Sequence, residues 1–136
     1  MKSRDTLIRL KRFQVDEKRR RVAQIEAMMA EFDRMAGDLD REIAGEEQRS
    51  GISDIAHFAY PTYAKAARTR RDNLKRSADD LKLQLSDAQA ELGEAFEALK
   101  KVEILDNRER SAERAAEAAR EQRAMDEIGL ARAMRA

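Results

Sequence analysis

Apolar residues recur every three or four positions along two long stretches of this chain. The first stretch carries Val22, Ile25, Met29, Phe32, Ala36, Leu39 and Ile43. The second carries Leu74, Ala78, Leu81, Leu85, Ala88, Leu92, Ala95, Leu99 and Val102. Apolar residues about 3.5 positions apart form a narrow strip, or seam, along a helix, and two helices bury their seams by winding around each other. The spacing therefore predicts two long helices in a coiled coil that encloses no pocket.

Composition narrows the alternatives. Of the 136 residues, 40% are charged and 4% are aromatic, which leaves too little apolar volume for a thick globular core. The single proline is Pro61 and the five glycines are scattered, so helix can extend over most of the length. We expect an all-α protein with a single coiled-coil domain over 1–136.

Composition also argues against a catalytic site and against export. The absence of Cys removes thiolate nucleophiles and thiolate metal sites. His57 is the lone histidine, and the carboxylates belong to polar helix faces. No glycine-rich phosphate loop, apolar signal core or run of roughly 18 apolar residues occurs. We therefore predict a soluble intracellular protein that is not an enzyme and has no catalytic, cofactor-binding or metal-binding residue.

Helix-breaking residues collect between the two seams. Gly51 suits the position after a helix end, and Pro61 suits the first turn of a new helix. Ser53 or Asp54 can cap a short extra turn between them. The predicted elements are a helix over about 5–49, a turn over 50–60 with room for a short helix, and a helix over about 61–132.

A chain that reverses near residue 55 brings together residues whose numbers add up to about 110. This antiparallel register pairs Val22 with Ala88, Ile25 with Leu85, Met29 with Leu81, Phe32 with Ala78, Ala36 with Leu74 and Ile43 with Ala67. Leu39 is the mismatch, because it faces Arg71. A shift of one heptad would preserve the seam spacing, so that alternative register stays open.

Charge follows the same pattern along the two helices. The antiparallel arrangement places the acidic stretch 31–47 beside the basic stretch 65–76, and the basic stretch 4–21 beside the acidic stretch 89–106. The basic run Lys18-Arg19-Arg20-Arg21 could bind phosphates, or it could be neutralised within the hairpin. The acidic residues expected to neutralise it are Asp87, Glu91 and Glu94.

A separate apolar stripe, the N-terminal stripe, has a spacing of three and consists of Leu7, Leu10 and Phe13. The seam itself continues toward the N-terminus through Val15 and Ile8. Either the seam shifts phase and buries this stripe, or the stripe faces a partner.

The second helix is long enough to overhang the first beyond Leu105. Opposite charges three or four positions apart can help to keep this C-terminal overhang helical. The expected pairs are Asp106 with Arg110, Arg110 with Glu113, Glu117 with Arg120 and Arg123 with Glu127.

The most specific string lies at the C-terminal end, over 121–135. It reads Glu-Gln-Arg-Ala-Met-Asp-Glu-Ile-Gly-Leu-Ala-Arg-Ala-Met-Arg and resembles the end of the FliJ family, small proteins of the flagellar type III export apparatus. The opening 7–13, the size and the two-helix organisation are also similar to that family, so the resemblance covers the whole chain. Ala124 departs from it, because the family often has a second base there.

The resemblance implies a partner at each end of the molecule. FliJ-like proteins resemble the coiled-coil stalk of rotary ATPase gamma subunits, and they link the export ATPase ring, FliI, to the export gate protein, FlhA. The residues expected to contact the ATPase are Leu7, Leu10, Phe13, Met125, Asp126, Glu127, Ile128 and Arg132. Those expected to contact the gate are Tyr60 and Tyr63, with packing of the turn under Phe58 as the alternative.

The resulting hypothesis is a non-enzymatic stalk in the cytoplasm, peripheral to the inner membrane at the flagellar base. It serves protein export, and hence motility and chemotaxis, with export chaperones as further partners. The alternative is an export chaperone or a general coiled-coil adaptor that holds apolar client segments. A nucleic-acid binder ranks third, because few aromatic residues are available to stack on bases.

Overall fold

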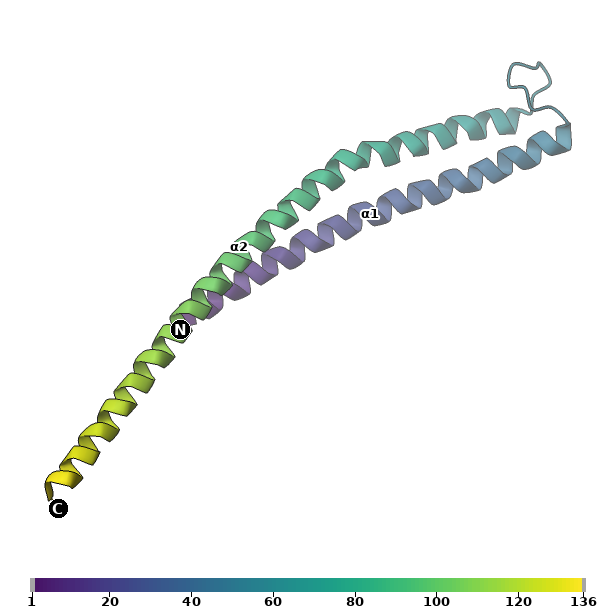
Figure 1. Cartoon of the computed structure of the whole chain (residues 1–136). Coiled ribbons are helices and arrows are strands. Elements are labelled where there is room, and N and C mark those ends of the chain that lie inside the picture. Colours follow the sequence, from purple (N-terminus) through teal and green to yellow (C-terminus); the bar gives the residue numbers. More distant parts are fainter. Residues whose placement is uncertain (1, 136) are drawn as a thin grey trace. The chain divides into compact units, whose positions relative to one another are not determined.

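Two long helices make up the computed structural model of this protein, which describes residues 2–135. Helix α1 spans Lys2–Ser50 (49 residues) and helix α2 spans Thr62–Arg135 (74 residues). Figure 1 shows both helices and the loop that joins them. The predicted all-α hairpin is confirmed, and both helices extend about three residues beyond their predicted outer ends.

Contacts divide the chain into two compact units. Unit 1 comprises Met1–Gln14 and Ala95–Ala136, and unit 2 comprises Val15–Glu94. Each unit thus contains a part of α1 and a part of α2. The expectation of a single domain stays a prediction.

The predicted seams form the core of the hairpin. Every residue in both predicted seams is buried or half-buried. In unit 2, Val22, Ile25 and Ala88 form one buried cluster. The partly buried residues packed against this cluster are Met29, Leu81, Leu85 and Leu92. The cluster confirms the antiparallel direction and brings together the predicted partners of the register near 110.

A second cluster in unit 2 contains the residue of the predicted mismatch. Leu39 is buried with Ile43 and Ala67. The Arg71 guanidinium reaches Asp40, the neighbour of Leu39, with 3.0 Å between Arg71 Nη1 and Asp40 Oδ1. The long apolar stem of arginine lets its charged head reach water beside a buried neighbour.

Ion pairs between the helices support the predicted charge pattern. Lys18 pairs with Glu91 at 3.0 Å and Arg71 pairs with Asp40, so the residue numbers add up to 109 and 111. These sums agree with the predicted register. Exposed pairs of this kind contribute little to stability, so the seam must supply most of the attraction between the helices.

The loop between the helices follows the predicted end signals. Gly51 has a φ of +73°, and its N–H donates to the Glu47 carbonyl at 2.9 Å. A left-handed residue after the last helical turn is the usual role of glycine there. The Pro61 carbonyl accepts the N–H of Lys65 at 3.1 Å, so α2 begins directly after Pro61. The loop contains turns, and the short helix for which it had room does not form.

The end of α2 in unit 1 is exposed as predicted for the overhang. Every described residue from Asn107 to Arg135 is solvent-exposed. The predicted ion pair of Asp106 with Arg110 is present, at 2.9 Å. The second partner of Arg110 is Asp5, at 2.9 Å, and not the predicted Glu113. Within the described residues, the other two predicted pairs of the overhang are not formed, so those two predictions are wrong.

We predict that Ile25→Ala lowers the free energy of unfolding by about 2–4 kcal/mol, because it removes buried methyl groups from a close-packed seam. Ile25 is 1% exposed. Leu83→Ala is the control, because Leu83 is 71% exposed, and it should change that free energy by no more than about 0.5 kcal/mol. Urea unfolding followed by circular dichroism at 222 nm measures both, and equal effects of the two substitutions would contradict the assigned core.

Candidate functional site

The described part of the chain has no cluster of side chains suited to metal binding. Residues 2–135 contain no group of three or more His, Cys, Asp or Glu side chains that could hold a metal ion. His57 stacks on Phe58 with ring centroids 4.8 Å apart, and its Nδ1 accepts the N–H of Ala59 at 3.0 Å. The ring therefore takes part in the turn. No helix in the described residues is apolar over a length that would cross a membrane.

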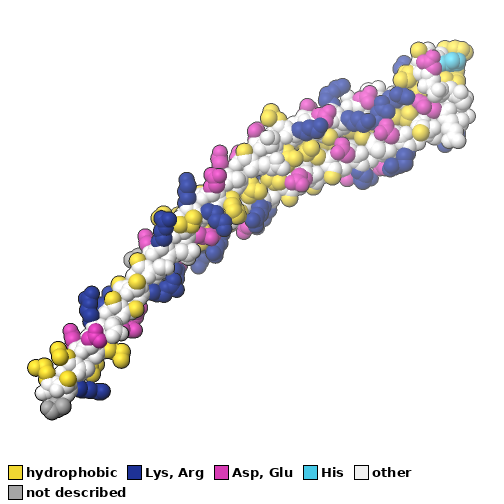
Figure 2. Space-filling model, in the orientation of Figure 1, with side chains coloured by type: hydrophobic (Ala, Val, Ile, Leu, Met, Phe, Trp, Pro, Cys, Tyr) yellow, Lys and Arg dark blue, Asp and Glu magenta, His cyan; other side chains and the backbone are white. Residues whose placement is uncertain are grey.

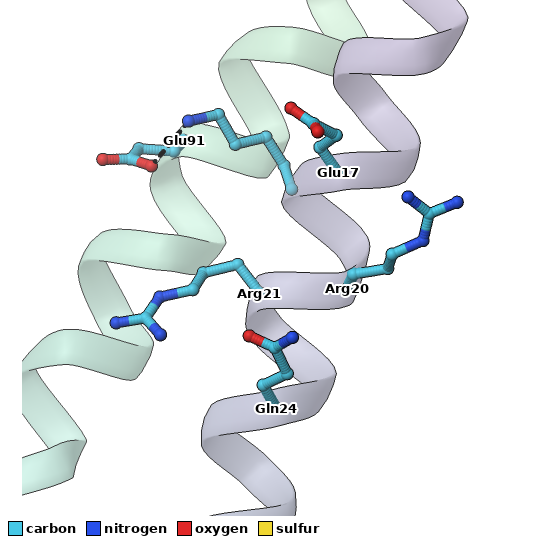
Figure 3. Close-up of a pocket in the computed structure, with 6 residues that line it drawn as sticks. Glu17, Arg20, Arg21, Gln24 and Glu91 are labelled. Carbon is cyan, nitrogen blue, oxygen red and sulfur yellow. Dashed lines mark hydrogen bonds and ion pairs between the residues drawn. The ribbon is translucent and has the colours of Figure 1, made fainter.

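A hollow between α1 and α2 in unit 2 is lined by charges of both signs. Its lining residues are Glu17, Lys18, Arg20, Arg21, Gln24 and Glu91. Lys18 pairs with Glu91 across it, and Figure 3 shows Arg20 and Arg21 pointing away from each other. Because acidic and basic groups alternate around this hollow, it offers no uniform field that would select an anion.

The basic run is only partly neutralised within the hairpin. Lys18 pairs with Glu91 at 3.0 Å. The side chains of Arg19, Arg20 and Arg21 form no ion pair or hydrogen bond with another side chain of the described residues, so the predicted neutralisation by Asp87 and Glu94 is wrong. These arginines remain hydrated on the surface of α1.

The N-terminal stripe lies outside the seam. Leu7, Leu10 and Phe13 are 42%, 50% and 53% exposed, whereas Ile8 and Val15 are buried. The interpretation that the hairpin buries this stripe is therefore wrong. At about 100° per residue, Leu7 lies roughly 90° around α1 from the row of Ile8 and Val15, and Leu10 and Phe13 each lie roughly 150° from it, on the side away from α2. The stripe is available to a partner.

Large apolar side chains are also exposed near the C-terminal end. Met125 and Ile128 are 68% and 54% exposed, and Figure 2 shows hydrophobic side chains at the surface there. Of the other predicted contact residues, Asp126 accepts a hydrogen bond from Gln122 at 3.0 Å. Glu127 and Arg132 are exposed.

Two exposed residues of this segment were missed by the sequence analysis. Leu130 and Met134 are 63% and 79% exposed. At about 100° per residue they lie on the face opposite Met125 and Ile128, so the last turns of α2 present apolar groups on two sides. Their spacing of four would have identified them.

Tyr60 is held in a polar cluster where the hairpin turns. Its side chain is buried, its hydroxyl donates to Glu47 Oε1 at 2.7 Å, and it accepts from Arg68 Nε at 2.9 Å. Arg68 Nη2 also donates to Glu47 Oε1 at 2.8 Å. The hydrogen bonds from Arg68 and then from Tyr60 hold the pKa of Glu47 below its ordinary value. This cluster joins the end of α1 to the start of α2.

Tyr63 and Phe58 are the accessible aromatic residues of the turn. Tyr63 is 54% exposed, and its hydroxyl donates to Glu42 Oε2 at 2.5 Å. This hydrogen bond to Glu42 raises the pKa of Tyr63. Phe58 is 97% exposed, so packing of the tyrosines under Phe58 is wrong. Sequence analysis missed Phe58 as a candidate contact, although an aromatic residue among helix breakers was a usable indication.

We predict that Glu47→Gln reduces the loss of stability in acid. A carboxylate whose folded pKa is lowered stabilises the fold above its unfolded pKa, and this contribution is lost as the pH falls through the folded value. The difference in the free energy of unfolding between wild type and variant should therefore be largest above pH 4.5, the ordinary pKa of Glu47. It should shrink below that pH. Urea midpoints at a series of pH values measure this, and Glu121→Gln, on the exposed overhang, serves as the control. A constant difference across the series would contradict the assigned cluster.

Comparison with known proteins gives one match. The model of one protein family, described as flagellar FliJ protein, matches residues 1–136. No curated protein matches the chain. No solved structure matches it either.

Proposed function

We propose, from the premise that the chain belongs to the flagellar FliJ family, that it is a non-enzymatic stalk that couples an export ATPase ring to the export gate. Membership of this family makes the protein a component of the flagellar export apparatus. Its partners within that machinery and its mode of action are the proposed part. The observation that carries the proposal is the long exposed end of α2 in unit 1.

The exposed end of α2 has dimensions that suit insertion into a ring. No hydrogen bond or ion pair to α1 is made by the described residues of α2 beyond Glu113. The remaining 22 residues of that helix, 114–135, give about 33 Å of single helix at ~1.5 Å per residue, roughly 10–12 Å wide. Exposed charges of both signs make weak, replaceable ion pairs. Such a helix can be held in a channel without being fixed in one position.

The proposed ATPase contacts all belong to unit 1. They are the N-terminal stripe and the last turns of α2: Leu7, Leu10, Phe13, Met125, Asp126, Glu127, Ile128 and Arg132. Exposed Leu, Met and Phe side chains on two segments of one unit provide apolar area that the hairpin itself does not bury. A ring that surrounds this unit would gain from covering that area.

The proposed gate contacts belong to unit 2. Tyr63 and the newly identified Phe58 offer exposed aromatic area for a gate protein similar to FlhA. Tyr60 is buried, so in this proposal it holds the turn in place through Glu47 and Arg68. Aromatic anchors of this kind are frequent among the residues that dominate binding energy.

The remaining parts of the proposal follow from the export role. The protein would work in the cytoplasm, peripheral to the inner membrane at the flagellar base, and would support motility and chemotaxis through flagellar assembly. Export chaperones are further candidate partners. The family match does not favour the alternative of a general chaperone or adaptor.

We predict that the purified chain raises the activity of its cognate export ATPase and that deletion of 120–136 abolishes this effect. The hairpin should stay folded, because the described residues of this segment, 120–135, are exposed and make no hydrogen bond or ion pair to α1. Steady-state ATP hydrolysis measures the effect, with circular dichroism as the folding control. Failure of the intact chain to change ATP hydrolysis, together with co-purification of an export substrate, would contradict the stalk.

A point substitution should separate the stripe from the overhang. Phe13→Ser removes an exposed apolar side chain from the stripe and should weaken ATPase binding by about tenfold. Leu83→Ser is matched to it, because Leu83 is also exposed but lies in unit 2, and it should have no effect. Binding curves for the two variants measure this, and equal affinities would remove the stripe from the proposed contact.

For the gate contact, Phe58→Ala should weaken binding to the cytoplasmic part of the gate protein by about tenfold, because it removes an almost fully exposed aromatic ring. ATPase stimulation should stay unchanged, since Phe58 lies outside unit 1. Pull-down with the purified gate fragment measures the loss. Unaltered gate binding would exclude Phe58 from the contact.

A further inference from the structure

The seam of α2 ends at a buried carboxylate. Asp106 follows Val102 by four residues and so takes the next seam position, where the pattern would otherwise place an apolar residue. It is 8% exposed, and no other polar or charged residue is buried in the described part of the chain. A charge at a core position requires a compensating partner.

That partner is Arg4, in the first turns of α1. Arg4 Nε lies 3.5 Å from Asp106 Oδ1, and both atoms are buried without any hydrogen-bond partner. The other oxygen of Asp106, Oδ2, accepts from Arg110 Nε at 2.9 Å. Arg4 Nε and Asp106 Oδ1 therefore interact through their opposite charges and not through a hydrogen bond.

Further ion pairs surround this central one within unit 1. Arg4 Nη2 donates to Glu113 at 3.1 Å, and its Nη1 donates to Glu109. Arg110 Nη2 donates to Asp5 at 2.9 Å. The six residues of this ionic cluster are Arg4, Asp5, Asp106, Glu109, Arg110 and Glu113.

The central pair is a poor device for stability. Moving two charges out of water is costly, and Arg4 and Asp106 make no hydrogen bond to each other that would offset this cost, so apolar residues at both positions would hold the helices together at least as well. A single polar residue in a coiled-coil seam does, however, fix the register, because most other registers leave it without a partner.

Two displaced registers of unit 1 leave one member of the central pair without its partner. Moving the register sum from 110 to 103 would set Arg4 against the buried Leu99. Moving it to 114 would set the Asp106 carboxylate against the buried Ile8. Each displacement buries a charge against an aliphatic side chain, which is strongly unfavourable.

We propose that the ionic cluster is a latch that fixes the register of the first turns of α1 on α2 and prevents these turns from fraying. The loop near residue 55 cannot do this, because the first turns of α1 are about 50 residues away from it along the chain. The latch does not depend on the proposed function, since it concerns contacts within the hairpin.

Asp106→Asn tests the latch because it keeps the side-chain shape and removes the charge. Amide hydrogen exchange of the full chain should speed up by about tenfold or more over 3–13 and stay unchanged over 22–43, because only the first turns are held by the cluster. Lys18→Gln is the control, since it removes an exposed ion pair between the helices, and it should leave both segments unchanged. Unchanged exchange over 3–13 in Asp106→Asn, or an equal rise over 22–43, would overturn the latch.

The double variant Arg4→Met with Asp106→Leu separates charge from packing. In wild type, raising the salt concentration to about 1 M should speed exchange over 3–13, because it screens the outer pairs. In the double variant, exchange should be slow and independent of salt. A double variant as salt-sensitive as wild type would overturn the latch.

Engineered cysteines report the register itself, and the chain has no native Cys to interfere. Ile8→Cys with Val102→Cys should form a disulfide in the observed register, whereas Ile8→Cys with Ala95→Cys requires the shift of seven residues that sets Arg4 against Leu99. Adding Asp106→Asn should raise the yield of the shifted disulfide several-fold relative to the native one. A ratio of yields that does not respond to Asp106→Asn would overturn the role in register.

Discussion

The packing of one narrow apolar seam against another is the interaction on which the rest of this structure depends. Each helix contributes a row of residues at heptad spacing, and the most deeply buried ones are small or β-branched. Ala64, Ala67, Ala78 and Ala88 on α2 are each at most 5% exposed. Small side chains on one helix allow the larger ones of the other to interdigitate, so a thin protein reaches close packing without a thick core.

Everything outside the seam is left to solvent or to partners. Exposed charges of both signs are distributed along both helices (Figure 2), and they contribute little to holding the hairpin together. Large exposed apolar side chains lie in the first turns of α1, in the loop and in the last turns of α2, and single ones lie elsewhere on the helices, such as Met28, Leu83 and Leu105. The proposed binding surfaces therefore lie where helix geometry prevents an apolar residue from joining the seam.

Polar clusters complement the seam in each unit. In unit 2, Glu47 joins Tyr60 and Arg68 near the turn, and in unit 1 Arg4 meets Asp106. Apolar contact between heptad seams is nearly indifferent to a shift of seven residues, whereas these polar groups have specific partners. The apolar seam residues thus hold the two helices together, and the polar clusters fix the register in which they pair.

The sequence by itself determined the two helices, their antiparallel direction, the turn at Gly51 and the buried positions of both seams. These features depend on periodicity and on the backbone preferences of glycine and proline, which are local properties. The resemblance at the C-terminal end also identified the family that the match over residues 1–136 shows.

Only the tertiary structure decided which way individual side chains turn. It paired Arg71 with Asp40, exposed the N-terminal stripe, buried Tyr60 and exposed Phe58. It also left Arg19, Arg20 and Arg21 unpaired and placed a buried carboxylate at Asp106. Long charged side chains reach several neighbours with similar energy, and the rotation of each helix about its axis follows from packing over many turns. The spacing of residues along the chain does not determine which neighbours these side chains contact.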